Sequence, residues 1–208
     1  MDIEVSTKLV PYKEAMQKMQ ARVTAVQAGA EEWAWFLEHP PIYTAGTSAK
    51  PKDLLHAEGF ELHTTGRGGQ YTYHGPGQRV VYAVLDLKAR AHARGTQPDL
   101  RLYVQQLEQW IIGALSTLGV ESFLREGRIG VWVNTPQGEA KIAALGVRVQ
   151  QWVTSHGIAI NLNPDLSHYA GIVPCGISQY GVTSLRALGC HASMAELDAA
   201  LRAQLPEF

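Results

Sequence analysis

The spacing of apolar residues predicts a few amphipathic helices with strands between them. Apolar residues recur at helical spacing over residues 11–28 and, most clearly, over residues 99–118, where Gly119 ends the pattern. A third helix is expected over residues 194–205 at the end of the chain. A short helix is expected over residues 52–58, because Gly59 follows as a helix stop.

Strands are expected where short apolar runs are bounded by Gly, Pro or Asn. Such runs cover residues 32–37, 60–65, 80–87, 130–134, 141–149 and 152–162. Residues 42–46 are interpreted as leading into a loop. Because the helices stand between groups of strands and do not follow each strand, the pattern predicts an α+β fold with a mixed or mostly antiparallel sheet flanked by helices. No linker or repeat interrupts the pattern, so we expect one domain over residues 1–208.

Composition and charge exclude several classes of function. The net charge is -1 over 208 residues and no Lys/Arg run is present, so nucleic-acid binding has no support. The N-terminal residues lack the apolar stretch of a secretory signal, and no apolar run is long enough to cross a membrane. Two cysteines give neither a disulfide framework nor a metal-ligand pair, so we expect a cytoplasmic protein without a metal or cofactor.

The segment 67–82, RGGQYTYHGPGQRVVY, is the most informative of the chain. Adjacent glycines beside polar and aromatic side chains are typical of a pocket wall where main chain approaches a ligand. The segment lacks both GxGxxG and GxxxxGK[ST], so it matches no common nucleotide loop. Arg67 has two possible roles here: it holds a carboxylate or phosphate, or it braces the loop by bonding carbonyls.

Cys175 stands in the sequence GIVPCGIS, between Pro174 and Gly176. A free cysteine is often a small buried apolar residue, but this framing also suits a nucleophile presented near backbone N–H groups. Cys190 lacks such framing and is interpreted as structural or incidental.

Lys141 opens the apolar run KIAALGVRV and is either a solvated charge at the end of a strand or a base that leans into a pocket. His74 and His156 each stand beside a glycine. Either one is a potential partner of Cys175 in a Cys-His pair, and the alternative is that both are hydrogen-bonding wall residues. The other six histidines show no pattern.

Together these segments resemble one family, the lipoyl(octanoyl) transferases, also called lipoate-protein ligase B. The matching segments follow the family's order: EHPPIYTAG, RGGQYTYHGPGQ, GRIGVWV, KIAALGVRV, HGIAINLNPDL, GIVPCGI and GVTSL. The resemblance extends from the thirties to the one-eighties, and no motif position departs from it.

The resemblance implies transfer of an octanoyl group from octanoyl-acyl carrier protein to a lysine of lipoyl domains, through a cysteine thioester. The implied acceptors are the lipoyl domains of 2-oxoacid dehydrogenase E2 subunits and the glycine cleavage H protein. The implied catalytic pair is Cys175 and Lys141. The implied fold is that of the biotin protein ligase and lipoate ligase catalytic domains. The implied substrate contacts are Arg67, Gly68, Gly69, Gln70, Tyr71, Thr72, Tyr73, His74, Ala144, Leu145, Gly146, Gly157, Ile158 and Ala159.

Three alternatives remain open at this point. An ATP-dependent lipoate or biotin ligase of the same fold activates a free acid and needs contacts for an adenylate. A cysteine hydrolase would pair Cys175 with His156 or His74 and release free octanoate. A non-catalytic acyl-binding module would bind the acyl carrier protein without becoming acylated.

Overall fold

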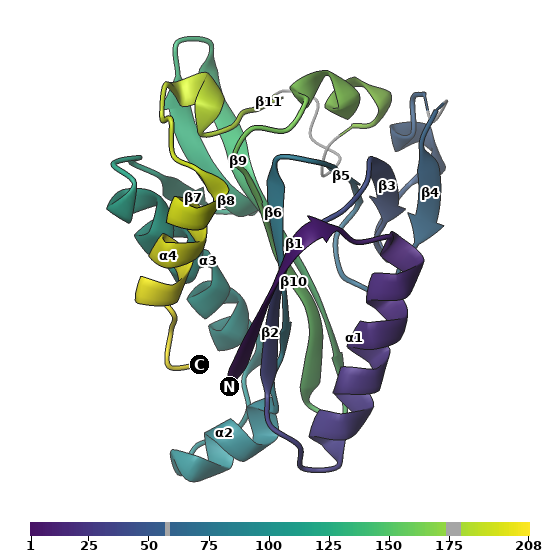
Figure 1. Ribbon diagram of the computed structural model, residues 1–208, viewed down its shortest axis with the longest axis vertical. Coiled ribbons are helices and arrows are strands. Elements are labelled where there is room, and N and C mark those ends of the chain that lie inside the picture. The colour runs from purple at the N-terminus through teal and green to yellow at the C-terminus, as the bar shows by residue number, and fades with distance from the viewer. Residues whose placement is uncertain (57–58, 174–179) are drawn as a thin grey trace.

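The computed structural model describes residues 1–56, 59–173 and 180–208, and a mixed β-sheet forms its centre (Figure 1). Within these residues, seven strands follow one another across the sheet, and β11 (Gly181–Val182) adds to β9. Among the strand pairs described in this main sheet, only β1–β2 and β9–β11 are parallel. The predicted α+β fold with a mixed, mostly antiparallel sheet is therefore confirmed. The order is β1 (Asp2–Leu9), β2 (Trp33–Glu38), β6 (Gln78–Val84), β10 (Val153–Asn161), β9 (Gly138–Gln150), β8 (Arg128–Thr135) and β7 (Phe123–Arg125).

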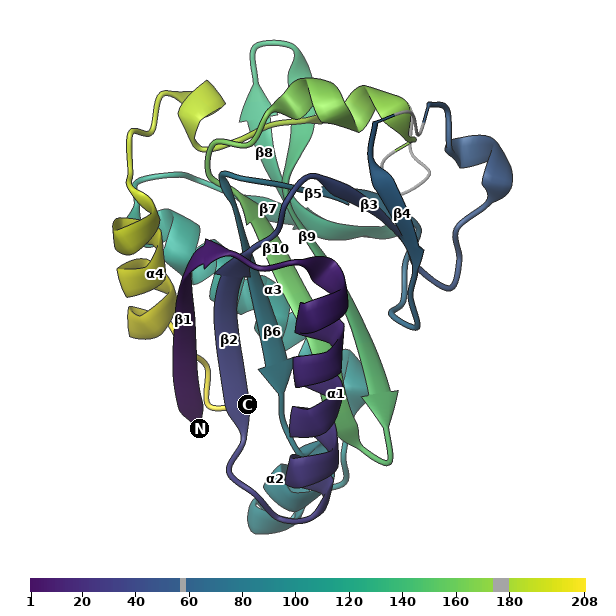
Figure 2. The ribbon, with the colours of Figure 1, turned by 45° about the vertical axis from the view of Figure 1, so that its right-hand side comes forward.

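A smaller sheet of three strands lies beside the N-terminal end of α1 (Tyr12–Gln27) (Figure 2). Its central strand β3 (Ile42–Ala45) pairs in parallel with β4 (Glu61–Thr64) and antiparallel with β5 (Tyr71–His74). The glycine-rich segment therefore belongs to a strand of this sheet and to the loop that enters it.

Helices cover both faces of the main sheet, and alternation along β2 shows how. Trp33, Trp35 and Leu37 pack with the apolar face of α1, while Ala34 and Phe36 belong to the core formed with α3 (Leu100–Thr117) and α4 (Met194–Ala203). Both sets are buried, as expected for a central strand covered on its two faces. None of the helices in the described residues is long and apolar enough to span a bilayer.

The predicted boundaries of α3 and α4 are close to the observed ones because capping residues fix them. The Asp99 carboxylate accepts hydrogen bonds from the backbone N–H groups of Arg101 and Leu102, and Gly119 follows α3 at φ +76°. At α4, Ser193 and Glu196 form a reciprocal capping box.

Several elements differ from the sequence expectations. The short helix expected over residues 52–58 was wrong: a 3₁₀ turn at Pro51–Asp53 is followed by extended backbone at Leu54, which pairs with Ile172. Residues 57 and 58 lie outside the described part.

Two expectations about strands also differ from the structure. Residues 42–45 form β3 and not the start of a loop. The expected strand 80–87 ends at Val84, because Asp86 caps a further helix, α2 (Leu87–Ala93). Strands β1, β5, β7 and β11 and the 3₁₀ helix Leu166–Gly171 were not predicted.

We predict that Leu102 and Leu107, two of the leucines of α3, differ sharply in their contribution to stability. Leu107 is fully buried, whereas Leu102 is 48% exposed although it fits the same apolar period. Leu107→Ala should lower the free energy of unfolding by about 2–5 kcal/mol, because it leaves a cavity. Leu102→Ala should change it by less than about 0.5 kcal/mol. Urea denaturation measures both, and equal losses would contradict this packing of α3.

Candidate active site

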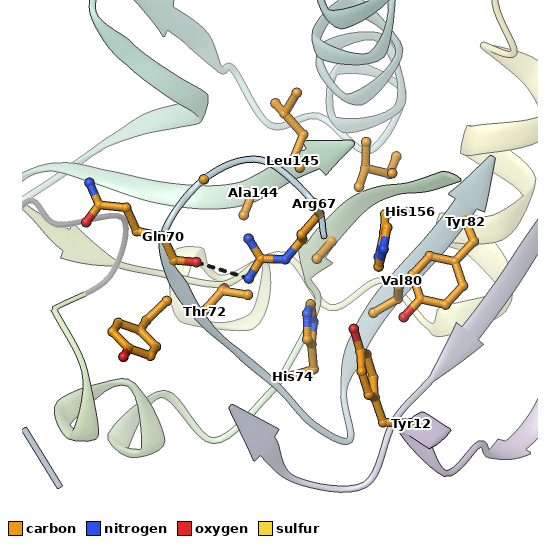
Figure 3. Close-up of a pocket in the computed structure, with 16 residues that line it drawn as sticks. Tyr12, Arg67, Gln70, Thr72, His74, Val80, Tyr82, Ala144, Leu145 and His156 are labelled. Carbon is orange, nitrogen blue, oxygen red and sulfur yellow. Dashed lines mark hydrogen bonds between the residues drawn. The ribbon is translucent and has the colours of Figure 1, made fainter. Parts of the chain in front are cut away.

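A pocket lies on the α1 side of the main sheet, where the glycine-rich loop crosses β9 and β10 (Figure 3). It encloses about 520 Å³ of empty space that is continuous with solvent. The main sheet forms its floor, the N-terminal end of α1 one side, and the loop and β5 its cover. Its lining residues are Tyr12, Arg67, Gly69, Gln70, Tyr71, Thr72, His74, Val80, Tyr82, Ala144, Leu145, Gly146, His156, Gly157, Ile158 and Ala159.

The substrate-contact segments expected from the resemblance come together at this pocket. All of those residues except Gly68 and Tyr73 line it. Residues 144–146 and 157–159 lie opposite one another in the β9–β10 ladder, with Gly146 paired to Gly157. Three segments far apart in the sequence therefore form one concave surface.

Glycines are required at this crossing because backbone from other segments occupies the space of a side chain. A Cβ at Gly146 would lie 2.9 Å from the carbonyl oxygen of Gly68, and one at Gly157 would lie 2.3 Å from that of Val81. The Gly68 N–H donates to the Val147 carbonyl at 2.9 Å. Gly68 therefore fastens the loop to β9, and it does not line the pocket.

Arg67 braces the loop. It is buried, and its guanidinium donates to the carbonyls of Gly68, Thr44 and Gln70 and to the Thr44 hydroxyl, at 2.7–3.1 Å. Of the two roles left open by the sequence, these contacts favour bracing. Figure 3 shows the guanidinium at the centre of the pocket, so the same side chain also supplies a positive charge to its wall.

Alternation along β5 separates two neighbouring residues of the RGGQYTYH motif. His74 faces the pocket, whereas Tyr73 is in the aromatic cluster under the small sheet. The Tyr73 hydroxyl is 2.8 Å from Nδ1 of His168, and the ring packs edge-on against Tyr43 and Tyr169. In this geometry Tyr73 supports the small sheet from the face opposite to the pocket.

The buried amide of Gln78 fixes the tautomer of His74. Its Nε2 donates to Asn161 Oδ1 and to the Tyr169 hydroxyl, both at 2.9 Å, so its Oε1 accepts from Nδ1 of His74 at 2.6 Å. Neutral His74 therefore carries its proton on Nδ1 and keeps an acceptor on Nε2. Asn161 and Tyr169 also line a smaller cavity that contains Lys141. Hydrogen bonds through Gln78 therefore connect His74 in the pocket with the wall of the Lys141 cavity.

Lys141 lies in a smaller cavity next to the pocket. Its side chain is 6% exposed, its Nζ donates to the Ile129 carbonyl at 2.7 Å, and Nζ lies 5.0 Å from the centre of a ring of Trp132. Thr72 and Ala144 line both cavities, so the two are adjacent. Of the two interpretations of Lys141, the structure excludes a solvated charge at the end of a strand.

Cys175 lies outside the described residues. The chain that follows it is placed: β11 pairs with β9, with Val182 opposite Lys141 itself. Cys190 is half-buried and packs beside the core between the sheet and α3, in agreement with a structural role.

Tyr12 lines the pocket but was missed from the sequence. Val80 and Tyr82 belong to the segment 67–82 that was expected to form a pocket wall, although the resemblance did not imply them as substrate contacts. Behind this wall lies His39, which is fully buried and was also missed. Its Nδ1 donates to the Val10 carbonyl and its Nε2 accepts from the Tyr82 hydroxyl, both at 2.7 Å. His39 is one of the six histidines that show no pattern in the sequence. It belongs to the matching segment EHPPIYTAG, which is the sequence signal that points to it.

The histidines at the pocket are neutral at physiological pH. Burial lowers the pKa of His39 to about 4 and those of His74 and His156 to about 3. The charge of Arg67 lowers the pKa of His156 further. Burial also raises the pKa of Tyr12 to about 12, so the phenol stays protonated. Arg67 is therefore the charged side chain among the residues that line this pocket. Among the described residues, no group of three His, Cys, Asp or Glu side chains is arranged to hold a metal ion.

Comparison with known proteins identifies the family to which this chain belongs. A family model described as the lipoyl protein ligase A/B catalytic domain matches residues 11–206. A protein of Parvibaculum lavamentivorans named octanoyltransferase is 54% identical over 95% of this chain and 88% of its own length. A protein of Acidiphilium cryptum, also named octanoyltransferase, is 56% identical over 93% of this chain and 85% of its own length. The chain belongs to the lipoyl protein ligase A/B family and is an acyltransferase.

Solved structures share the fold at low sequence identity. A lipoate-protein ligase A bound with ATP superposes with a TM-score of 0.74 at 15% identity, over 98% of this chain and 84% of the other. A biotin protein ligase from Aquifex aeolicus superposes with a TM-score of 0.53 at 11% identity, over 98% of this chain and 66% of the other. The prediction that the chain has the fold of the lipoate and biotin protein ligase catalytic domains is confirmed.

We predict that acid destabilises the protein through these neutral histidines. In the unfolded chain a histidine binds a proton below pH 6.5, but the folded state resists protonation down to about pH 4 at His39. The unfolded state therefore binds more protons in this window, and stability falls as the pH decreases from 6.5 to 4, by about 1.4 kcal/mol per pH unit for each such histidine.

His39→Gln should weaken this pH dependence, whereas exposed His92→Gln should leave it unchanged. Urea denaturation at a series of pH values measures the slopes. Parallel curves for wild type and His39→Gln would contradict a neutral, buried His39.

Proposed function

We propose that the chain transfers an octanoyl group from octanoyl-acyl carrier protein to a lysine of lipoyl domains, through a thioester on Cys175. The observation that carries the proposal is the 52–56% identity to proteins named octanoyltransferase over nearly the whole chain. The lipoyl domains of 2-oxoacid dehydrogenases and the glycine cleavage H protein are the proposed acceptors, and the cytoplasm is the proposed location. The pocket supports the acyl part of the proposal, because its walls include Val80, Leu145, Ile158 and Ala159.

In the first half-reaction, the Cys175 thiolate attacks the carbonyl carbon of the octanoyl thioester. The bond to the carrier's phosphopantetheine sulfur breaks, and Lys141 donates a proton to the departing sulfur. One thioester replaces another, so no ATP is required. An ordinary cysteine is only a small percentage thiolate at neutral pH, and a lysine beside it favours the thiolate either as a cation or as a base.

In the second half-reaction, the neutral amine of the acceptor lysine attacks the acyl-Cys175 carbonyl. An amide forms, Cys175 leaves as the thiolate, and Lys141 accepts the proton lost by the amine. The burial of Lys141 and its bond to the Ile129 carbonyl support this role, because a fixed side chain is held ready for both proton transfers. Trp132 packs over the same ammonium group and restricts its position.

The acyl chain would extend from the Lys141 cavity past Thr72 and Ala144 into the larger pocket. These two residues line both cavities, which makes them the connection between the reacting carbonyl and the hydrocarbon tail. Each buried methylene contributes about 0.8 kcal/mol, so the length of the chain is a selectable property.

We predict that Cys175→Ala abolishes the acyl-enzyme, because no other thiol replaces it. Cys190→Ser is the matched control and should form the adduct normally, since Cys190 packs beside the core. Lys141→Met keeps most of the length of the unbranched side chain and removes the amine. It should slow acylation about 10²–10⁴-fold, as expected for loss of a general acid and base.

Mass spectrometry of the intact protein after incubation with octanoyl-acyl carrier protein measures the adduct. An octanoyl group on Cys190, or on neither cysteine, would overturn the assignment. Transfer from free octanoate that requires ATP and magnesium would indicate a ligase, and release of octanoate without an acceptor domain would indicate a hydrolase.

A further inference from the structure

The acyl pocket is separated from a second cavity by two side chains. This second cavity encloses about 530 Å³ that is continuous with solvent, and it lies between the N-terminal half of α1 and the ends of β9 and β10. Tyr12 and His156 line both cavities. We refer to this pair as the partition.

Tyr12 is held in the partition by the rings around it. It is the first residue of α1 and is 6% exposed, with ring centres of His39 and His63 at 5.3 and 4.8 Å. Figure 3 shows its hydroxyl directed into the pocket near His156 and Tyr82. Within the described residues, no hydrogen bond involves this hydroxyl. The end of the pocket therefore presents a hydroxyl that no described protein group satisfies.

His156 reaches the partition through an unusual backbone conformation. Its φ is +61°, in the left-handed region that a histidine seldom occupies within a strand. Its N–H is directed to the sulfur of Met19 at 3.2 Å, a weak acceptor, and not to a carbonyl. Strained backbone of this kind is concentrated at functional sites, where it places a side chain for a purpose.

The two ends of the acyl pocket differ in chemistry. Thr72 and Ala144 connect one end to the Lys141 cavity. The middle is apolar at Val80 and Ala159, and the opposite end carries the hydroxyls of Tyr12 and Tyr82 and the imidazole of His156. A methylene gains free energy against the apolar middle, but against this end it covers polar groups that lose their access to water.

We propose that Tyr12, backed by His156, sets the length of the acyl chain that the enzyme accepts. This proposal rests on the proposed acyl transfer and adds a specificity-determining residue to it. A chain of eight carbons ends before the partition, and a longer chain is stopped by the ring of Tyr12 and by the polar groups around it. Removal of that ring joins the two cavities and gives a longer chain a path between Met16 and Met19, which line the second cavity.

The test compares kcat/KM for acyl-carrier-protein donors with chains of 8, 10, 12 and 14 carbons and a lipoyl-domain acceptor. In Tyr12→Ala the ratio of the 12-carbon to the 8-carbon donor should rise at least about tenfold, the size of effect that one or two methylenes have in an apolar pocket. Tyr12→Phe keeps the ring and removes the hydroxyl. It should raise the ratio of the 10-carbon to the 8-carbon donor by a smaller factor and leave longer chains excluded.

Met16→Ala is the control, because Met16 follows one turn later on the same helix and lines only the second cavity. Its chain-length profile should match the wild type. If wild type transfers octanoate but neither Tyr12 variant changes the profile, the partition does not set chain length. If wild type transfers no acyl group from any donor, the proposed function itself fails. If Tyr12→Ala is unfolded by circular dichroism, Tyr12→Phe decides the question alone.

Discussion

Strand β9 and the glycine-rich loop meet at Gly146, where the carbonyl of Gly68 occupies the space in which any other residue would carry its Cβ. The hydrogen bond from Gly68 to Val147 closes the contact, and Arg67 holds the loop in shape from within. Because this contact fixes the loop above the sheet, it also fixes β5, and with it the orientation of His74. The pocket depends on this approach of two backbones more than on any pair of side chains.

The pocket wall contains polar side chains that are buried and, except for Arg67, uncharged. His39, His74 and His156 are neutral because burial lowers their pKa values. Hydrogen bonds orient two of these rings: Nδ1 of His74 donates to Gln78, and Nε2 of His39 accepts from the Tyr82 hydroxyl. A neutral, oriented imidazole offers an acceptor without placing a charge beside a hydrocarbon chain. Arg67 keeps its charge, and its donors are used by the carbonyls of the loop that it braces.

Much of the fold was predictable because helices α1, α3 and α4 and strand β10 carry long, regular apolar patterns. Strand β1 was missed because its residues are at most half-buried and show no alternation. Strands β3 and β5 have only four residues each and stand among prolines and glycines, where the local signals favour loops. The resemblance located the pocket segments. It did not point to Tyr12, because the direction of a helix relative to a sheet is set by tertiary packing. The assignments of Cys175 and Lys141 to catalysis, and of one domain to the whole chain, stay predictions.

The pairing of Gly146 with Gly157 across β9 and β10 has a consequence for how the pocket responds to its ligand. At this rung the two strands have no side chains to repack, so the floor is formed by main chain alone. Main chain in the middle of a sheet has no rotamers to exchange, and it loses little conformational entropy when a ligand covers it. The floor is thus preorganised, and adaptation to a bound chain falls to the aromatic rings at the far end.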